Sequence, residues 1–170
     1  MKTKTLYALL ILCTVSIQAQ TKKEDCKCCT ENHTKFDFWV GDWVVKDTTG
    51  KIVGENKINK IQDKCAIQEN WTSASGTTTG TSFNYYDSND DTWNQIWVDN
   101  QGSQLVLKGK PSENKMVLKS KMLKGKKIAF YYHQITWTLQ KDGTVIQHWE
   151  IYDKNHNVLN SLFKGVYSKK

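Results

Sequence analysis

Arginine is absent from the 170-residue chain, and proline occurs once, at Pro111. All 24 basic residues are therefore lysines, and they are scattered along the sequence rather than gathered into a stripe. Because nucleic-acid recognition relies on clustered cations and on the planar fork of arginine, this composition argues against a nucleic-acid-binding protein. A sustained helical period is also missing, which argues against a parallel sheet built with crossover helices.

Long apolar runs are equally scarce, and the one that is present lies at the start of the chain. Lys2 and Lys4 precede an apolar run from Leu6 to Ile17, which is followed by the small residue Ala19. The run is shorter than the ~20 residues that cross a bilayer. This arrangement is typical of a signal peptide, predicted here over residues 1–19. We therefore expect an exported protein, periplasmic or secreted, without stable membrane insertion; its oligomeric state stays open.

The cysteine pattern suits an exported chain. Cys13 lies within the predicted signal peptide, and the bulky Leu12 before it fits a lipid-attachment site poorly. The other cysteines, three of them in a polar leader over residues 20–35, are Cys26, Cys28, Cys29 and Cys65. Disulfides persist in oxidising compartments, and four cysteines allow three pairings. The simpler interpretation is that Cys65 tethers the leader through one of the other three. The alternative is a metal or redox site that combines the leader cysteines with His33, because thiolates and imidazole suit soft metals.

From residue 36 onward, short runs rich in Val, Ile, Thr, Tyr and Trp alternate with turn signals such as Asp142-Gly143. The runs cover residues 38–46, 52–62, 65–73, 81–87, 92–99, 104–110, 115–123, 128–140, 144–152 and 158–167. Strands at this spacing favour consecutive hairpins in a barrel or sandwich. Gly54 and a break in the apolar alternation predict a bulge in the second run. We therefore predict a single all-β domain over residues 36–170.

Several short motifs carry a family resemblance. They are Phe36-Asp37-Phe38-Trp39-Val40-Gly41-Asp42-Trp43, Glu69-Asn70-Trp71, Tyr86-Asp87, Trp93-Asn94-Gln95-Ile96-Trp97-Val98-Asp99, Ile135-Thr136-Trp137, Gln147-His148-Trp149-Glu150 and Gly165-Val166-Tyr167. With them the chain resembles secreted bacterial proteins of the DUF1579 type, in the calycin superfamily. The resemblance covers most of the chain after residue 35. It implies a single antiparallel, up-and-down, lipocalin-like barrel of about ten strands, and it brings no established activity.

The opening motif gives this resemblance its most specific element. Gly41-Asp42-Trp43 is similar to the G-x-W of the first lipocalin strand. In that fold the glycine lets the chain bend into the barrel, and the tryptophan plugs the closed end. Lipocalins usually pack an arginine from the last strand on this tryptophan, whereas here we expect only Lys164 to be available.

Alternation along the runs predicts which side chains point into the barrel. The predicted inward sets are Cys65, Ile67, Glu69 and Trp71; Phe83 and Tyr85; Trp93, Gln95 and Trp97; Met116 and Leu118; Tyr131, His133, Ile135 and Trp137; and Val145, Gln147, Trp149 and Ile151. A barrel of this size holds either a packed core or one small ligand. Mostly aromatic positions with a few polar groups are typical of a small-molecule pocket.

Eight of the inward residues are candidates for ligand binding: Glu69, Trp71, Tyr85, Gln95, Trp97, His133, Gln147 and Trp149. A buried carboxylate at Glu69 is costly unless it is paired or protonated. We expect it either to form a structural hydrogen bond to Gln95, Gln147 or a tryptophan N–H, or to orient a ligand.

Three functions fit these residues. The leading hypothesis is an exported protein that binds a small, largely apolar molecule inside the barrel. One alternative is a hydrolase or isomerase that uses Glu69 with His133 across the cavity. The other is a structural or interaction module whose aromatic side chains fill the barrel.

Recognised catalytic motifs are missing. The sequence holds no nucleophile elbow, phosphate loop, metalloprotease motif or dinucleotide fingerprint. We therefore predict no catalytic residue, no metal site and no cofactor, with one exception that the family resemblance brings in. Some barrels of the superfamily bind haem, and His133 could serve as its axial ligand.

Overall fold

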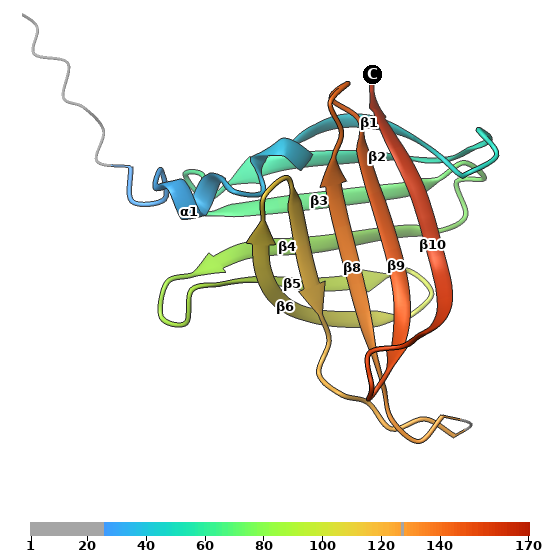
Figure 1. Ribbon diagram of the computed structural model, residues 1–170. Coiled ribbons are helices and arrows are strands. Elements are labelled where there is room, and N and C mark those ends of the chain that lie inside the picture. The colour runs from blue at the N-terminus through green and yellow to red at the C-terminus, as the bar shows by residue number, and fades with distance from the viewer. Residues whose placement is uncertain (1–25, 127) are drawn as a thin grey trace, which may run out of the picture.

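The computed structural model describes residues 26–126 and 128–170. The predicted signal peptide, Cys13 and the start of the leader lie outside the described residues. Over the described ranges, ten antiparallel strands form a closed barrel (Figure 1). They are β1 Gly41–Lys46, β2 Ile52–Ile61, β3 Ala66–Ser73, β4 Thr79–Asp87, β5 Thr92–Asp99, β6 Gln104–Ser112, β7 Lys115–Lys119, β8 Tyr131–Leu139, β9 Val145–Asp153 and β10 Val158–Lys169.

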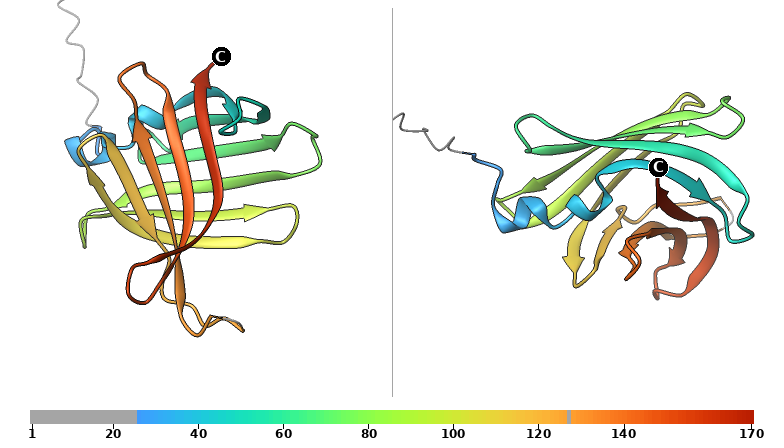
Figure 2. Two further views of the ribbon diagram at one scale, coloured as in Figure 1. Left: turned by 45° about the vertical axis from the view of Figure 1, so that its right-hand side comes forward. Right: turned by 90° about the horizontal axis from the view of Figure 1, so that it is seen from above.

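Each strand pairs with the next along the chain, and β1 pairs with β10 to close the barrel. This order confirms the predicted all-β, up-and-down architecture. Strands β2–β5 cross β8–β10 at a steep angle and enclose the interior between them (Figure 2). Among the residues that the structure describes, none belongs to a helix long and apolar enough to cross a membrane.

The turns follow from the aspartates that precede them. The carboxylate of Asp47 accepts a hydrogen bond from the backbone N–H of Thr49, and that of Asp142 accepts one from Thr144. Asp153 repeats the pattern with the N–H of Asn155. These Asx turns reverse the chain between neighbouring strands and explain why the Asp-containing segments mark hairpins.

Pairing between β1 and β2 slips at one position. Val45 pairs with Gly54, whereas Lys46 pairs with Ile52, so Val53 is left out of the ladder. This irregularity confirms the bulge that was predicted beside Gly54.

The first predicted run, over residues 38–46, is wrong at its start, because residues 38–40 form no strand. A short helix α1 (Glu31–Thr34) is followed by the 3-10 helix η1 (Asp37–Trp39), and β1 begins only at Gly41. This turn of helix carries Phe36 and Trp39 into the barrel before the strand begins. Gly41 has φ +140°, a conformation that favours glycine, and a Cβ there would overlap the amine of Lys169.

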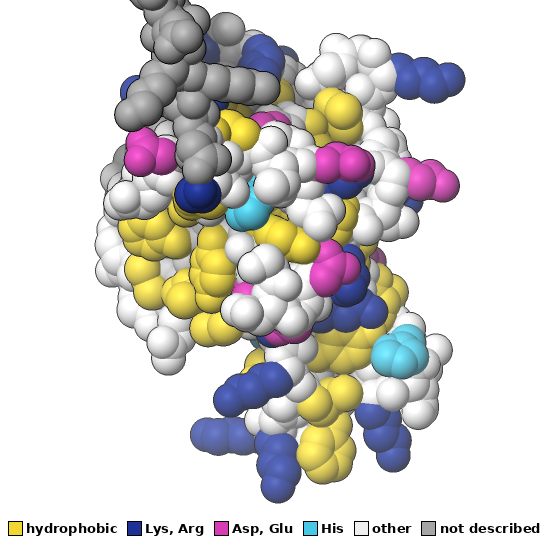
Figure 3. Space-filling model, turned by 90° about the vertical axis from the view of Figure 1, so that its left-hand side faces the viewer, with side chains coloured by type: hydrophobic (Ala, Val, Ile, Leu, Met, Phe, Trp, Pro, Cys, Tyr) yellow, Lys and Arg dark blue, Asp and Glu magenta, His cyan; other side chains and the backbone are white. Residues whose placement is uncertain are grey.

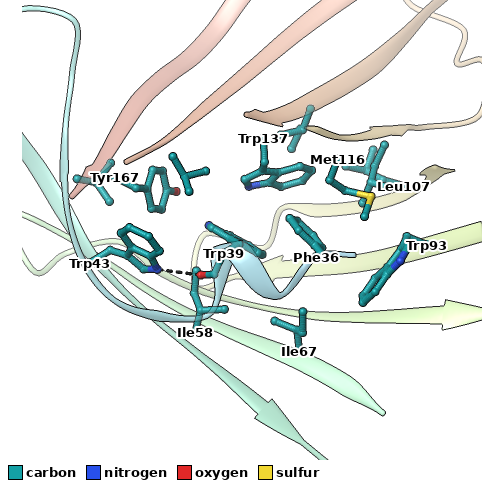
Figure 4. Packing of buried hydrophobic residues seen from close by; sticks show 14 of the residues in the cluster. Phe36, Trp39, Trp43, Ile58, Ile67, Trp93, Leu107, Met116, Trp137 and Tyr167 are labelled. Carbon is teal, nitrogen blue, oxygen red and sulfur yellow. Dashed lines mark hydrogen bonds between the residues drawn. The ribbon is translucent and has the colours of Figure 1, made fainter. Parts of the chain in front are cut away.

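Phe36 and Trp39 plug one end of the barrel, and both are fully buried. Their rings stack with centroids 5.0 Å apart, and Phe36 also contacts Trp93 and Trp137 edge-on. In Figure 4 the plug lies between Trp137 and the side chains of Ile58 and Ile67. The N-terminal segment therefore fills this end of the core.

A lysine of the last strand does cover the Trp43 ring, but it is not Lys164. Lys169 pairs with Trp43, and its Nζ lies 3.9 Å from the ring centroid. The Lys169 amine also donates to the carbonyl of Val40. Lys164 is exposed on the outer face. The expectation of Lys164 was wrong because it has the opposite parity on β10.

Disulfides tie the leader to the barrel. Within the described residues, Cys28 bonds to Cys65 in the β2–β3 turn, and Cys26 bonds to Cys29. The predicted tether through Cys65 is confirmed. In this paired state the four cysteines offer no thiolates to a metal, and the described residues hold no group of three or more His, Cys, Asp or Glu side chains that could bind a metal ion. The redox alternative stays a prediction, because a disulfide is the oxidised form of a dithiol.

Candidate functional site

A cavity of about 260 Å³ lies inside the barrel, away from the plug. Strands that run from the plug to the cavity show how far apart the two lie. On β5, Trp93 packs against the plug, whereas Trp97 lines the cavity further along the same strand. Since a strand rises ~3.3 Å per residue, the two regions are separated by roughly 13 Å.

Aromatic and aliphatic side chains form the walls of this cavity. The apolar lining residues are Trp71, Trp97, Leu105, Ile135, Trp149, Leu162 and Phe163. Trp71 and Phe163 meet edge to face, with ring centroids 6.2 Å apart. Leu162 is 42% exposed, so the wall reaches the surface. The apolar part of the cavity is therefore continuous with its opening.

Two glycines make room for the indole rings. A Cβ at Gly54 would lie 2.4 Å from the Trp71 ring, and one at Gly80 would lie 2.1 Å from the Trp97 ring. Both indoles therefore lie against the backbone of a neighbouring strand instead of projecting across the barrel. This placement leaves the centre open.

Glu69 lies at the buried side of the cavity and is 4% exposed. Its carboxylate accepts hydrogen bonds from the Asn56 side-chain amide at 2.7 Å and from the Ser82 hydroxyl at 2.6 Å. Burial raises the pKa of Glu69 to about 7, although the bonds from Ser82 and Asn56 act in the opposite direction. The predicted partners Gln95, Gln147 and a tryptophan N–H were therefore wrong. Ser82 pairs directly with Glu69 on β4, and Asn56 reaches the carboxylate diagonally from β2, two residues before the Glu69 partner Ile58.

Hydrogen bonds extend from Glu69 in both directions across the barrel. On one side, the Gln95 side-chain amide donates to Oδ1 of Asn84 at 2.8 Å, and Nδ2 of Asn84 donates to the Ser82 hydroxyl at 2.9 Å. On the other, the Tyr167 hydroxyl donates to Gln147 and lies 3.5 Å from the Asn56 amide. We call this set the polar layer: Asn56, Glu69, Ser82, Asn84, Gln95, Gln147 and Tyr167. Burial, with Glu69 nearby, raises the pKa of Tyr167 well above its ordinary value, so its hydroxyl stays a donor.

Six of the eight predicted site residues lie in the cavity wall: Glu69, Trp71, Gln95, Trp97, Gln147 and Trp149. Tyr85 does not, since its side chain points outward and is 40% exposed. Phe83, also predicted to point inward, points outward as well. The inward residues of β4 are Ser82 and Asn84, because Ser82 pairs with Glu69 across the ladder and paired residues share a face. The parity was misjudged because the larger apolar side chains were assumed to be the buried ones.

His133 is the second predicted residue outside the cavity wall. Its Nδ1 accepts a hydrogen bond from the Trp149 indole N–H at 3.0 Å. The ring is partly buried, which lowers the pKa of His133. His133 therefore holds Trp149 in place. Within the described residues it forms no hydrogen bond to Glu69 and does not share the cavity lining with it.

The expectation of haem gains no support from this site. Scaling from benzene in a 150 Å³ cavity, the available volume admits roughly ten non-hydrogen atoms, far fewer than a porphyrin contains. His133, the predicted axial ligand, is also held by Trp149 outside the lining.

Several members of the site were missed from the sequence, namely Asn56, Ser82, Asn84 and Tyr167. Alternation places Asn56 in phase with Ile58, which is buried, and this signal could have found it. Ser82 and Asn84 needed the pairing register of β3 and β4, which alternation within one strand does not provide.

No known family model matches the chain, and no curated protein matches it in sequence. The likeness of its motifs to DUF1579-type proteins stays a prediction. Function must be inferred from the cavity and its chemistry.

Proposed function

We propose that this protein is an exported, lipocalin-like protein that binds one small, largely apolar molecule in the barrel cavity. The observation that carries the proposal is a cavity with aromatic walls and hydrogen-bonding groups along one side. Apolar walls with a few placed polar groups are the usual composition of small-molecule sites.

The cavity volume limits the size of the ligand. At about 260 Å³ it is smaller than the ~300–1,000 Å³ of drug-sized sites. Room for roughly ten non-hydrogen atoms suits a single ring with a short substituent. The polar layer would meet the polar end of such a molecule, and the open wall near Leu162 would admit it.

The filled-barrel alternative accounts for only one end of the molecule. Phe36 and Trp39 fill the plug end completely. Around the cavity, in contrast, Gly54 and Gly80 let Trp71 and Trp97 lie back against the strands. Small residues at both positions favour an interior kept open for a ligand.

Export is supported by the disulfides at the edge of the barrel. Cys28–Cys65 and Cys26–Cys29 bonds would persist in an oxidising compartment and would be reduced in most cytosols. The predicted signal peptide points the same way.

Native mass spectrometry of the protein from its native host tests the proposal. We expect the wild type to carry an additional small-molecule mass. Leu105→Trp should abolish it, because Leu105 lines the cavity. Val106→Trp is the matched control, because Val106 is 62% exposed on the same strand. Absence of any adduct from the wild type, or equal adducts on both variants, would contradict the proposal.

A further inference from the structure

The ionisable groups of the cavity have a distinctive composition. Glu69 and Tyr167 line it, and among the residues that the structure describes no lysine or histidine does so. The chain nevertheless has a formal net charge of +7. Lysine side chains project from the lower end of the molecule in Figure 3, where Figure 1 shows the β7–β8 connection. An anionic ligand would therefore find no counter-charge inside.

The walls of the cavity suit a cation. Trp71, Trp97 and Trp149 contribute indole rings, and the face of an indole attracts a positive charge through its quadrupole. The hydrogen bond from Trp149 to His133 fixes the orientation of one ring. Phe163 adds a further aromatic side chain to the wall.

We infer that the bound molecule is a small organic amine, whose ammonium group lies at the Glu69 carboxylate and whose hydrocarbon part lies among the aromatic walls. This inference rests on the proposed function and narrows its ligand class.

The carboxylate of Glu69 has capacity for such a ligand. A carboxylate offers about four acceptor positions. Within the described residues, Asn56 and Ser82 use two of them, one on each oxygen. An ammonium group brings three donors and the opposite charge. It would supply the counter-ion that the hydrogen-bonding neighbours do not.

The surroundings of Glu69 determine how pH acts on binding. From β10, the facing titratable group is Tyr167, which is neutral. The facing polar groups of β2, β4, β5 and β9 are amides and a hydroxyl, and on β8 His133 lies outside the lining. Burial raises the pKa of Glu69 to about 7. Below this pH Glu69 must release its proton before it can pair with an ammonium group, so amine affinity falls as the pH falls.

Isothermal titration calorimetry with three matched probes tests the inference. They are 2-phenylethylamine, 2-phenylethanol and 3-phenylpropionate, which share a phenyl ring and differ in charge. At pH 8 we expect the oxidised wild-type protein to bind the amine about tenfold more tightly than the alcohol, and the carboxylate most weakly. Between pH 8 and pH 6 amine affinity should fall about tenfold, while alcohol affinity stays constant.

Glu69→Gln separates the charge from the shape of the site. In this variant the amine and the alcohol should bind within about threefold of each other, and alcohol binding reports that the cavity is still folded. Glu55→Gln is the matched control, because Glu55 is exposed and pairs with Lys170. It should retain the preference for the amine.

The remaining outcomes distinguish the two proposals. Alcohol or carboxylate binding as tight as that of the amine overturns the amine inference and leaves a small-molecule binder. An amine preference that persists in Glu69→Gln also overturns it. Failure of all three probes to bind overturns the inference as well, and it overturns the proposed function too if the protein from its native host carries no adduct.

Discussion

The two ends of the barrel interior use the same kind of side chain for opposite results. At the plug end, Phe36 and Trp39 are fully buried against Trp137. At the cavity end, Trp71 and Trp149 are only partly buried and line an open space. The difference arises from a segment outside the strands, because residues 36–39 enter the first region and not the second. Inward aromatic residues alone do not decide whether a barrel is filled or hollow.

The largest expected loss of stability comes from removing one side chain of the plug. Trp39→Ala should lower the free energy of unfolding by about 3–5 kcal/mol, because it removes a fully buried indole from a packed core. Trp149→Ala at the cavity should cost about 1–2 kcal/mol, because its ring is already partly solvated. Urea denaturation measures both. Equal losses would remove the distinction between the two ends.

The second-largest loss of stability is expected from removing the Cys28–Cys65 disulfide, which tethers the plug segment. Replacing both Cys28 and Cys65 by alanine opens a loop with a sequence separation of 37. The chain-entropy relation gives a loss of roughly 4 kcal/mol for this loop.

The second disulfide provides a control for this prediction. Cys26 and Cys29 have a sequence separation of 3, and the same relation gives roughly 2 kcal/mol for their removal. Urea denaturation of both double variants measures the difference. A larger loss on removing Cys26 and Cys29 would show that the leader is not held through Cys65.

The polar layer should make stability depend on pH. The folded-state pKa of Glu69 is about 7, above the ordinary value of 4.5. The folded state therefore holds a proton that the unfolded state has released between these values, and stability falls as pH rises from 4.5 to 7. The contribution is roughly 3 kcal/mol and levels off above pH 7. Thermal and urea unfolding across this range should show the fall in the wild type and a flatter profile in Glu69→Gln. A Glu55→Gln profile as flat as that of Glu69→Gln would contradict the assignment.

The smallest expected effect lies where β1 meets β10 beside the plug. Lys169→Met removes the cation over Trp43 and the donor to Val40. We expect a loss of about 1 kcal/mol. Lys170→Met removes an exposed ion pair with Glu55 and should change stability by less than about 0.5 kcal/mol. Urea midpoints compare the two, and an equal response would mean that the contact with Trp43 adds nothing.

Much of the fold could be predicted because its signals are local. Turn aspartates and alternating apolar residues mark each hairpin, and consecutive hairpins determine the strand order. The η1 segment could not be predicted in this way. Phe38 and Trp39 have the composition of a strand start, and only the packed structure shows that Trp39 joins Phe36 in the plug.

The site was predictable only where alternation within a strand agrees with the pairing between strands. Glu69 and Trp71 were placed correctly because the inward side of β3 is also its more apolar side. Tyr85 was wrongly predicted to point inward, because the inward residues of β4 are Ser82 and Asn84. Ser82 donates a hydrogen bond to Glu69, and Asn84 accepts one from Gln95. The polar residues that point into a barrel can be predicted only when their partners on other strands are known.

Closure of the barrel by β1 and β10 has a consequence for folding. Trp43 pairs with Lys169, so the first strand cannot complete its hydrogen bonds until residues 158–169 have been synthesised. Until then, the growing chain has two unpaired strand edges, which can bind other chains. Contacts so distant in the sequence also form slowly. The finished barrel is therefore a product of the whole chain, and a fragment that lacks β10 should aggregate instead of folding.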